Sequence, residues 1–271
     1  FIYVEDVARC NVMAMKADIK FGFYNVGTEV QTSIKELCDT GLMQEVIDVS
    51  EFKEMKELSK TDGKKVSTLK CIEKLIDANW AGKRNSSKAS LILTEGDSAK
   101  AFAVAGLSII GKDAYGIFPL RGKLLNVRNA TAKQLKINAE FINLKVILGL
   151  KQGMKYNDVS KLRYGSIIIL TDQDPDGSHI KGLIINMFEH FWPSLLKIDG
   201  FIRTINTPII KAWKKTDKKK SDIKIFYTIS DFQKWVRDEL QGDLSKWEYK
   251  YYKGLGTSTE REAKESFCDF D

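Results

Sequence analysis

Residues 166–180 read SIIILTDQDPDGSHI and join an apolar run to an acidic cluster. The run is typical of a buried strand, because it is short, mostly apolar and ends on polar residues. Residues 179–197 then have the apolar spacing of a long helix. Asp172, Asp174 and Asp176 therefore occupy the connection between a buried strand and a helix, and this stretch sets the fold prediction for its neighbours.

The same alternation of apolar strands and helices continues on both sides of this stretch. It predicts an α/β fold with a mainly parallel sheet that is covered by helices on both faces. The expected strands are residues 90–95, 115–122 and 166–172, with further candidates at 201–213, 224–229 and 247–254. The expected helices are residues 98–109, 132–150, 179–197 and 231–240, and residues 41–88 are expected to form a charged helix and a connector.

Carboxylates follow two of the expected strands, at the edge where such sheets bind ligands. Glu95 and Asp97 end one strand, and Asp172 ends another. Unpaired carboxylates that converge raise one another's pKa and destabilise the fold, and a divalent cation removes that cost. Oxygen ligands favour Mg²⁺, Mn²⁺ or Ca²⁺ over zinc. The alternative for a single Asp-x-Asp is a polar loop with a helix-capping aspartate, which leaves the convergent glutamate unexplained.

Two other metal sites are disfavoured by the residues present. An EF-hand starting at Asp172 needs glutamate at its twelfth position, but Leu183 stands there. Four widely spaced cysteines and two histidines argue against a zinc site. We therefore expect magnesium at the end of a strand.

The 271-residue chain has a net charge of +7 and a pI near 9.0, which suits a polyanionic partner. Four basic residues follow the first acidic strand end: Lys100, Arg121, Lys123 and Arg128. No apolar run is long enough to span a membrane. Phe1 is not a start methionine, so we expect the chain to be part of a longer one.

Four segments carry a resemblance to a known family: LILTEGDSAK (91–100), PLRGKLLNVR (119–128), ILTDQDPDGSHIKGL (169–183) and YYKGLGTS (251–258). In this order they resemble the metal-binding Toprim region of type IIA DNA topoisomerases of the eukaryotic or large-DNA-virus type. The resemblance covers about residues 41–271. It implies a connector at 41–88, a Toprim domain at 89–258 and the start of a winged-helix region at 259–271.

The resemblance also implies roles for individual residues. Glu95 would be a metal ligand and the catalytic acid or base. Asp172 and Asp174 would hold Mg²⁺, for which Mn²⁺ or Ca²⁺ substitutes, and Asp176 would join them in some states. The positions that would line DNA are Ser98, Arg121, Lys123, Asn126, His179, Lys253 and Thr257.

In the family, a homodimer uses ATP to pass one DNA duplex through a break held by a tyrosine. None of the nine tyrosines here has a matching context. We expect the nucleophilic tyrosine and the ATPase domain outside this chain, which alone would bind metal and DNA weakly and cleave nothing. The implied compartment is the nucleus, or a viral factory in the cytoplasm. The alternatives are another Toprim enzyme, such as a primase or nuclease, and a non-enzymatic DNA-binding Toprim fragment.

Residues 1–40 resemble a different family. YVEDVARCN and YNVGTEV are similar to the C-terminal part of extended NAD-dependent sugar epimerases and dehydratases. The segment has no GxxGxxG motif and no YxxxK pair, so it is not expected to bind NAD. We expect a junction near Thr40–Gly41, made by a gene fusion or a chimeric sequence.

Overall fold

The computed structural model describes residues 42–66, 69, 72–217, 222–257 and 259–267, with six isolated positions (5, 8, 9, 12, 13 and 16) before them. The chain divides into two compact units, Phe1–Lys53 and Glu54–Asp271. Helix α3, Leu42–Ser59, begins in the first unit and ends in the second. Apart from the isolated positions, the segment that resembles an epimerase lies outside the described residues, and the predicted domain boundaries stay predictions.

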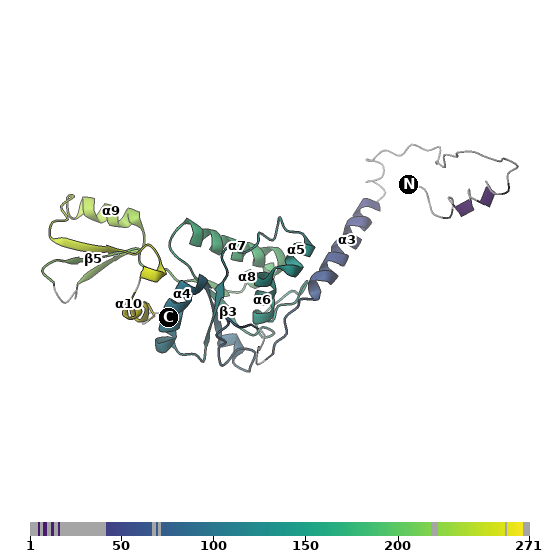
Figure 1. The fold of residues 1–271 in the computed structure, drawn as a ribbon, viewed down its shortest axis with the longest axis horizontal. Helices are drawn as coiled ribbons and strands as arrows, with labels where there is room; N and C mark the ends of the chain where they lie inside the picture. The colour runs from purple at the N-terminus through teal and green to yellow at the C-terminus, as the bar shows by residue number, and fades with distance from the viewer. Residues whose placement is uncertain are drawn as a thin grey trace. The chain divides into compact units, whose positions relative to one another are not determined.

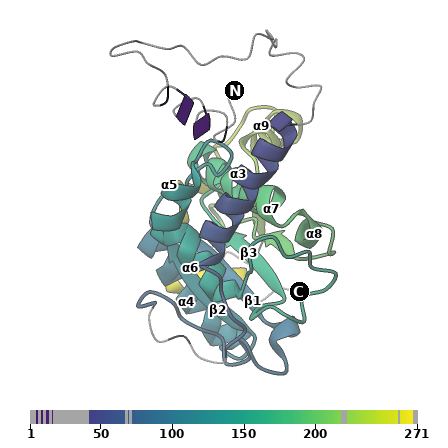
Figure 2. The same ribbon diagram turned by 90° about the vertical axis from the view of Figure 1, so that its right-hand side faces the viewer.

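A four-stranded parallel sheet forms the centre of the second unit, in the order β2-β1-β3-β4 (Figures 1 and 2). Its strands are β1 (Ser90–Glu95), β2 (Tyr115–Leu120), β3 (Ser166–Leu170) and β4 (Ile202–Thr204). All three strand pairs are parallel. This sheet confirms the predicted α/β fold.

Helices cover both faces of this sheet (Figure 1). Because neighbouring residues of a strand point to opposite faces, Leu91 and Leu93 enter one core while Ile92 enters the other. The first core includes α6 (Ala139–Leu148) and α7 (Pro175–Phe191), and the second includes α4 (Gly96–Ile110) and α10 (Glu260–Ser266). The shorter helices are η1 (Ser86–Lys88), α5 (Ala132–Ile137), α8 (Pro193–Leu196) and η2 (Leu255–Thr257). No helix among the described residues is long and apolar enough to cross a bilayer.

A small antiparallel sheet, β6-β5-β7, follows the parallel one. It consists of β5 (Ile210–Lys214), β6 (Ile223–Phe226) and β7 (Trp247–Tyr251), with α9 (Ile229–Asp238) after β6. Its core is formed by Ile210, Ala212, Phe226 and Trp235. The sequence prediction of further strands and a helix here was correct, but it did not separate them into a second sheet.

Two predicted elements are divided in the structure. The strand expected at 201–213 is two strands, because β4 and β5 belong to different sheets. Pro208 lies between them and has no N–H to donate to a strand ladder. The helix expected at 132–150 breaks at Asn138, which ends α5 and caps α6 by accepting a hydrogen bond from Phe141 N at 2.9 Å.

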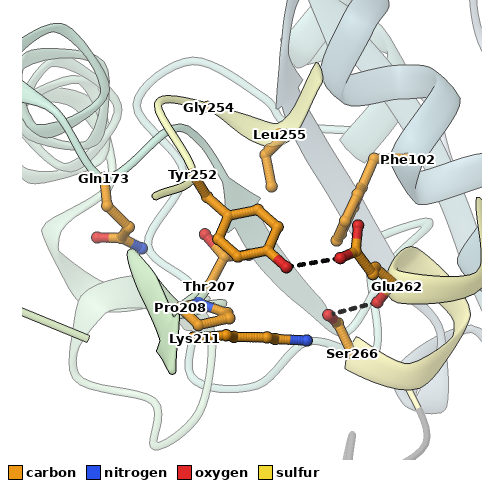
Figure 3. Close-up of a pocket in the computed structure, with 10 residues that line it drawn as sticks. All are labelled: Phe102, Gln173, Thr207, Pro208, Lys211, Tyr252, Gly254, Leu255, Glu262 and Ser266. Carbon is orange, nitrogen blue, oxygen red and sulfur yellow. Dashed lines mark hydrogen bonds between the residues drawn. The ribbon is translucent and has the colours of Figure 1, made fainter. Parts of the chain in front are cut away.

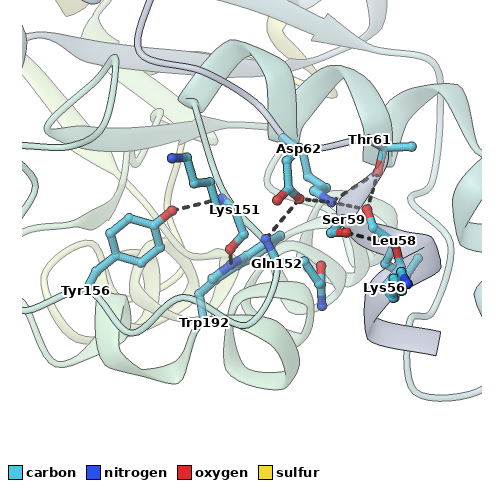
Figure 4. A network of polar contacts seen from close by, with 10 residues as sticks. Lys56, Leu58, Ser59, Thr61, Asp62, Lys151, Gln152, Tyr156 and Trp192 are labelled. Carbon is cyan, nitrogen blue, oxygen red and sulfur yellow. Dashed lines mark hydrogen bonds and ion pairs between the residues drawn. The ribbon is translucent and has the colours of Figure 1, made fainter. Parts of the chain in front are cut away.

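A buried cation ties the end of α3 to the rest of the second unit. Lys145 is fully buried; its Nζ donates to Leu58 O at 2.8 Å and pairs with Asp62 Oδ1 at 2.9 Å. Asp62 also accepts from Gln152 N at 2.9 Å (Figure 4). Burial lowers the pKa of Lys145, while the neighbouring Asp62 opposes that shift. Each charge in this network has a partner.

Candidate metal and nucleic-acid site

Glu95 stands at the centre of the carboxyl edge of the parallel sheet. It ends β1, where it is paired in register with Leu120 of β2 and directly follows Thr94, the partner of Leu170. The next residues of the flanking strands therefore lead to Arg121 on one side and to Asp172 on the other. The strand register alone brings the acidic and the basic motif to the same edge.

The Glu95 carboxylate is only partly satisfied. Its Oε2 atom is buried and has no hydrogen-bond partner within the described structure. Burial raises the pKa of Glu95, the charges of Asp172, Asp174 and Asp176 raise it further, and a hydrogen bond from the Asp172 backbone lowers it in part. A buried acceptor without a partner is rare and costly, and it indicates a group that a ligand satisfies.

Asp172 lies just beyond β3 and is held by the turn after β7. Its Oδ1 accepts a hydrogen bond from Leu255 N at 2.7 Å. Gly254 of the same turn approaches so closely that an added Cβ would lie 2.3 Å from Asp172 Oδ2. Only glycine therefore fits there without moving the carboxylate.

Asp174 caps α7. Its Oδ1 accepts from Gly177 N at 2.7 Å, and Pro175 occupies the first turn, where a missing N–H costs nothing. The helix-capping role, weighed above as the alternative for a single Asp-x-Asp, is thus present in Asp174. A capping carboxylate keeps lone pairs free for a second partner.

Asp176 points to a cation. Its Oδ1 lies 2.8 Å from Lys123 Nζ, in a pair whose side chains are 65% and 47% exposed respectively. The hydrogen bond and charge of Lys123 lower the pKa of Asp176, and the charge of His179 adds to this. The pair links the acidic motif to the PLRGK motif.

The carboxylates at this edge are chemically suited to a hard divalent cation, although their side chains do not already surround a single point. In the described part of the chain, no three His, Cys, Asp or Glu side chains form a metal cluster. The charges of Asp172, Asp174 and Asp176 nevertheless all act on Glu95 at one edge. With its oxygen-only donors and the unpartnered Glu95 Oε2, this edge suits Mg²⁺ better than zinc.

The structure places most, but not all, of the predicted DNA-lining residues at the surface near this edge. Ser98, Arg121, Lys123, His179 and Lys253 have exposed positions around this edge. Asn126 is engaged elsewhere, because its Oδ1 accepts from Asn186 Nδ2 at 3.0 Å and from Arg128 N at 3.2 Å. Thr257 ends η2, and its side chain lies outside the described part.

Sequence reasoning missed several partners at this edge. Lys74 pairs with Asp97 at 3.0 Å, so Asp97 is a partner of lysine in this structure. Glu140 reaches the Arg121 backbone, and its buried Oε2 has no partner among the described residues. Burial raises the pKa of Glu140, and the contact with Arg121 lowers it in part. No local pattern marks Lys74 or Glu140.

Tyr252 and Glu262 were also missed. The Tyr252 hydroxyl donates to Glu262 Oε1 at 2.6 Å beneath Leu255 (Figure 3). A local signal existed for Glu262, because Thr259-x-x-Glu262 is a capping-box pattern. The contact with Tyr252 had no such signal.

Comparisons with known proteins identify the family of this chain. A family model described as the Toprim domain matches residues 90–208, and one described as the C-terminal associated domain of TOPRIM matches residues 205–271. The DNA topoisomerase 2 of Pisum sativum is 49% identical over 239 residues, which are 88% of this chain and 16% of that protein. The chain belongs to the Toprim region of the eukaryotic and viral DNA topoisomerase 2 family.

Further members of the DNA topoisomerase 2 family are similar to this chain over most of its length. The proteins of Drosophila melanogaster and Acanthamoeba polyphaga mimivirus are 49% and 48% identical over 92% and 91% of the chain, and it covers 17% and 20% of them. A solved structure, the Plasmodium falciparum topoisomerase II DNA-binding, cleavage and re-ligation domain, is 52% identical with a TM-score of 0.70. That match covers 76% of this chain and 27% of the other. The chain thus spans less than a third of each of these relatives.

The comparisons give no support to an epimerase-like segment at residues 1–40. The Drosophila alignment covers 92% of the chain, which is more than residues 41–271 alone provide. The alignment thus reaches into the first forty residues, and the junction expected near Thr40–Gly41 stays a prediction.

Proposed function

We propose that this chain supplies the divalent-metal site and part of the DNA-binding surface with which a type IIA topoisomerase cleaves and reseals duplex DNA. One observation carries the proposal: the buried, unpartnered Oε2 of Glu95 lies at the same sheet edge as Asp172, Asp174 and the Arg121–Lys123 loop. A phosphodiester placed there meets both metal-binding oxygens and phosphate-binding cations.

Glu95, Asp172 and Asp174 would hold Mg²⁺, and Asp176 would join them once Lys123 is drawn to a phosphate. When bound, the metal supplies stabilisation of charge on the phosphate oxygens and orients the leaving oxygen. Glu95 would also exchange a proton with the reacting oxygen, because its carboxylate lies at the edge where the phosphodiester is proposed to bind.

Arg121 and Lys123 would bind the DNA backbone without reading its sequence, because phosphate contacts carry no base information. Ser98, His179 and Lys253 would extend this surface on the same edge, and Asn126 and Thr257 remain proposed members. The proposed partner is therefore duplex DNA.

The remaining parts of the reaction belong to the whole protein. The nucleophilic tyrosine, the ATP-hydrolysing domain and the main contacts of a homodimer are proposed to lie in the parts of the relatives that this chain does not cover. A nuclear site of action is proposed for a cellular protein and a cytoplasmic factory for a viral one.

The metal site is tested by titrating the chain with Mn²⁺ and following water-proton relaxation. The wild-type chain should bind Mn²⁺, and the double variant Glu95→Gln/Asp174→Asn should lose that binding. Asp238→Asn removes one exposed carboxylate on α9 and serves as the matched control. Equal binding by the wild type and the double variant would sink the assignment.

The DNA surface is tested by the salt dependence of binding to a duplex of arbitrary sequence. The double variant Arg121→Ala/Lys123→Ala removes two phosphate-binding cations and should reduce the log–log slope by about 1.8. Lys234→Ala, on the exposed side of α9, should leave the slope unchanged. A slope that is the same in all three proteins contradicts the proposed surface. Binding that is equally strong with and without metal would favour a non-enzymatic DNA-binding fragment.

A further inference from the structure

The position of the Asp172 side chain depends on a short turn from another part of the chain. Leu255 N donates to Asp172 Oδ1, and Gly254 packs against Asp172 Oδ2. Gly254 follows β7 and Leu255 is the first residue of η2, and both lie more than eighty positions along the chain from Asp172. Whatever fixes this turn therefore fixes the geometry of a proposed metal ligand.

Tyr252 anchors the turn at its start. The residue is 9% exposed, and its backbone N–H donates to Ile209 O at 2.8 Å. Two lysines approach its ring, with Lys250 Nζ 4.6 Å and Lys211 Nζ 5.8 Å from the ring centroid. Its hydroxyl donates to Glu262 Oε1, as Figure 3 shows.

Glu262 does more than cap a helix. In a capping box, the glutamate needs only to accept from the backbone N–H of the capping residue. Glu262 Oε2 accepts a hydrogen bond from Thr259 N at 2.8 Å, and Thr259 Oγ1 in turn accepts one from Glu262 N at 3.3 Å. Its other oxygen is left for Tyr252, and Lys250 Nζ lies 3.0 Å from both oxygens.

The charge state of Glu262 supports this arrangement. Burial alone would raise the pKa of Glu262, but hydrogen bonds from Tyr252, Thr259 and Lys250 hold it at about 2. The carboxylate therefore remains an acceptor at neutral pH. The chain of contacts runs from the first turn of α10 through Tyr252 and the Gly254–Leu255 turn to Asp172.

We propose that Tyr252 and Glu262 are positioning residues that hold Asp172 in its metal-binding orientation through the Gly254–Leu255 turn. The inference rests on the proposed function of the acidic edge. It assigns the contact between Tyr252 and Glu262 a part in metal affinity, in addition to any part in stability.

A purely structural role is the competing explanation. Helix α10 also packs on α4, where the rings of Phe267 and Phe102 are 5.9 Å apart between centroids. If Tyr252 and Glu262 only docked this helix, their loss would lower stability and leave the affinity of the folded protein for metal unchanged.

The test measures Mn²⁺ affinity and thermal stability of the full 271-residue chain, far below the unfolding temperature of every variant. Tyr252→Phe removes one hydroxyl and keeps the ring, and should weaken Mn²⁺ binding by up to about tenfold, the lower end of the effect of losing a direct outer-shell partner of a ligand. Glu262→Gln should weaken it at least as much, because one acceptor oxygen becomes a donor.

Two controls separate the explanations. Tyr249→Phe changes an exposed tyrosine on β7, three positions before Tyr252, and should leave Mn²⁺ affinity unchanged. Thr259→Ala breaks the capping box while leaving the hydroxyl of Tyr252 on Glu262, and should lower stability without changing affinity.

The outcomes distinguish this inference from the function on which it rests. If the wild-type chain shows no Mn²⁺ binding that depends on Glu95, the proposed function fails, and the positioning role fails with it. If the wild type binds and Tyr252→Phe binds equally well, only the positioning role is overturned. The positioning role is also overturned if the loss of Mn²⁺ affinity is proportional to the loss of thermal stability in all four variants, Thr259→Ala included.

Discussion

The acidic edge around Glu95 and the buried network around Arg163 both place charge inside the second unit, but they differ in how that charge is satisfied. Arg163 is fully buried and donates to Val66 O, Ile147 O and Asp77. Glu95 has a buried oxygen with no partner in the described structure. Since burying a charge is tolerated only when it is paired, the first region stabilises the fold, and the second is the one that we propose receives a ligand.

The same contrast appears in the pKa values. Tyr164 donates to Asp77, and both burial and the Asp77 charge raise the pKa of this tyrosine, so it stays a neutral donor. At the acidic edge, burial and the charges of neighbouring carboxylates raise the pKa of Glu95. Partnered groups thus keep one protonation state in the first region, whereas the raised pKa of Glu95 accords with the cation site proposed at the acidic edge.

The largest expected effect comes from breaking the partnered network. Asp77→Ala leaves the guanidinium of Arg163 buried without its counter-charge and removes the acceptor of Tyr164. The free energy of unfolding should fall by about 3–5 kcal/mol, as when one partner of a buried pair is removed. Urea denaturation measures this loss.

The matched control is an aspartate at the surface. Asp113 is exposed and accepts a hydrogen bond from Asn79 Nδ2 at 2.7 Å. Asp113→Ala should cost under about 1 kcal/mol, since an exposed contact is exchanged with water. Equal losses in the two variants would show that the Arg163 network contributes no special stability.

A second effect, of about 3 kcal/mol, is expected from acid. The pKa of Glu262 is about 2 in the folded protein against an ordinary 4.5, so folding favours its ionised form. That stabilisation is fully present above pH 4.5 and is lost as pH falls towards 2. The stability difference between the wild type and Glu262→Gln should therefore shrink by about this amount from about pH 5 to about pH 2.

Glu260 provides the comparison for the acid experiment. It lies in the same helical turn, pairs with Lys264 at 2.7 Å and is 72% exposed. Glu260→Gln should leave the acid dependence close to that of the wild type. A difference between wild type and Glu262→Gln that is constant with pH would mean that Glu262 is not held as a paired carboxylate.

The two regions also differ in how far the sequence predicts them. The acidic edge could be predicted, because alternating apolar strands and helices imply a parallel sheet and its carboxyl edge collects Glu95 and Asp172. The pairing of Asp77 with Arg163 could not be predicted, because no periodicity links residues that are 86 positions apart. The division of residues 201–213 into two strands was missed although Pro208 marked it, since the apolar pattern continues on both sides.

Contacts around the site were predictable only where the signal is local, and the signal at Glu262 was present but was not used. Asp174 as a helix cap and Thr259-x-x-Glu262 as a capping box follow from neighbouring residues. The contacts of Asp172 with Leu255 and of Tyr252 with Glu262 depend on how the turn after β7 folds back on the sheet. Such contacts are set by tertiary packing, which a single sequence does not reveal.

The smallest expected effect has the opposite sign and tests the comparison most directly. If Glu95 is left unsatisfied for a ligand, Glu95→Gln should stabilise the metal-free protein by about 1 kcal/mol, because residues kept for function commonly cost stability. The same variant should lose the stabilisation that Mn²⁺ gives to the wild type, since a ligand that binds only the folded state raises the free energy of unfolding. Denaturant unfolding with and without Mn²⁺ measures both quantities.

Lys145→Met is the contrasting change. The charge of Lys145 is paired with Asp62, so its loss should destabilise the protein with and without Mn²⁺. If Glu95→Gln is less stable than the wild type and Mn²⁺ still stabilises it, Glu95 would be a residue that, like Arg163, serves the stability of the fold.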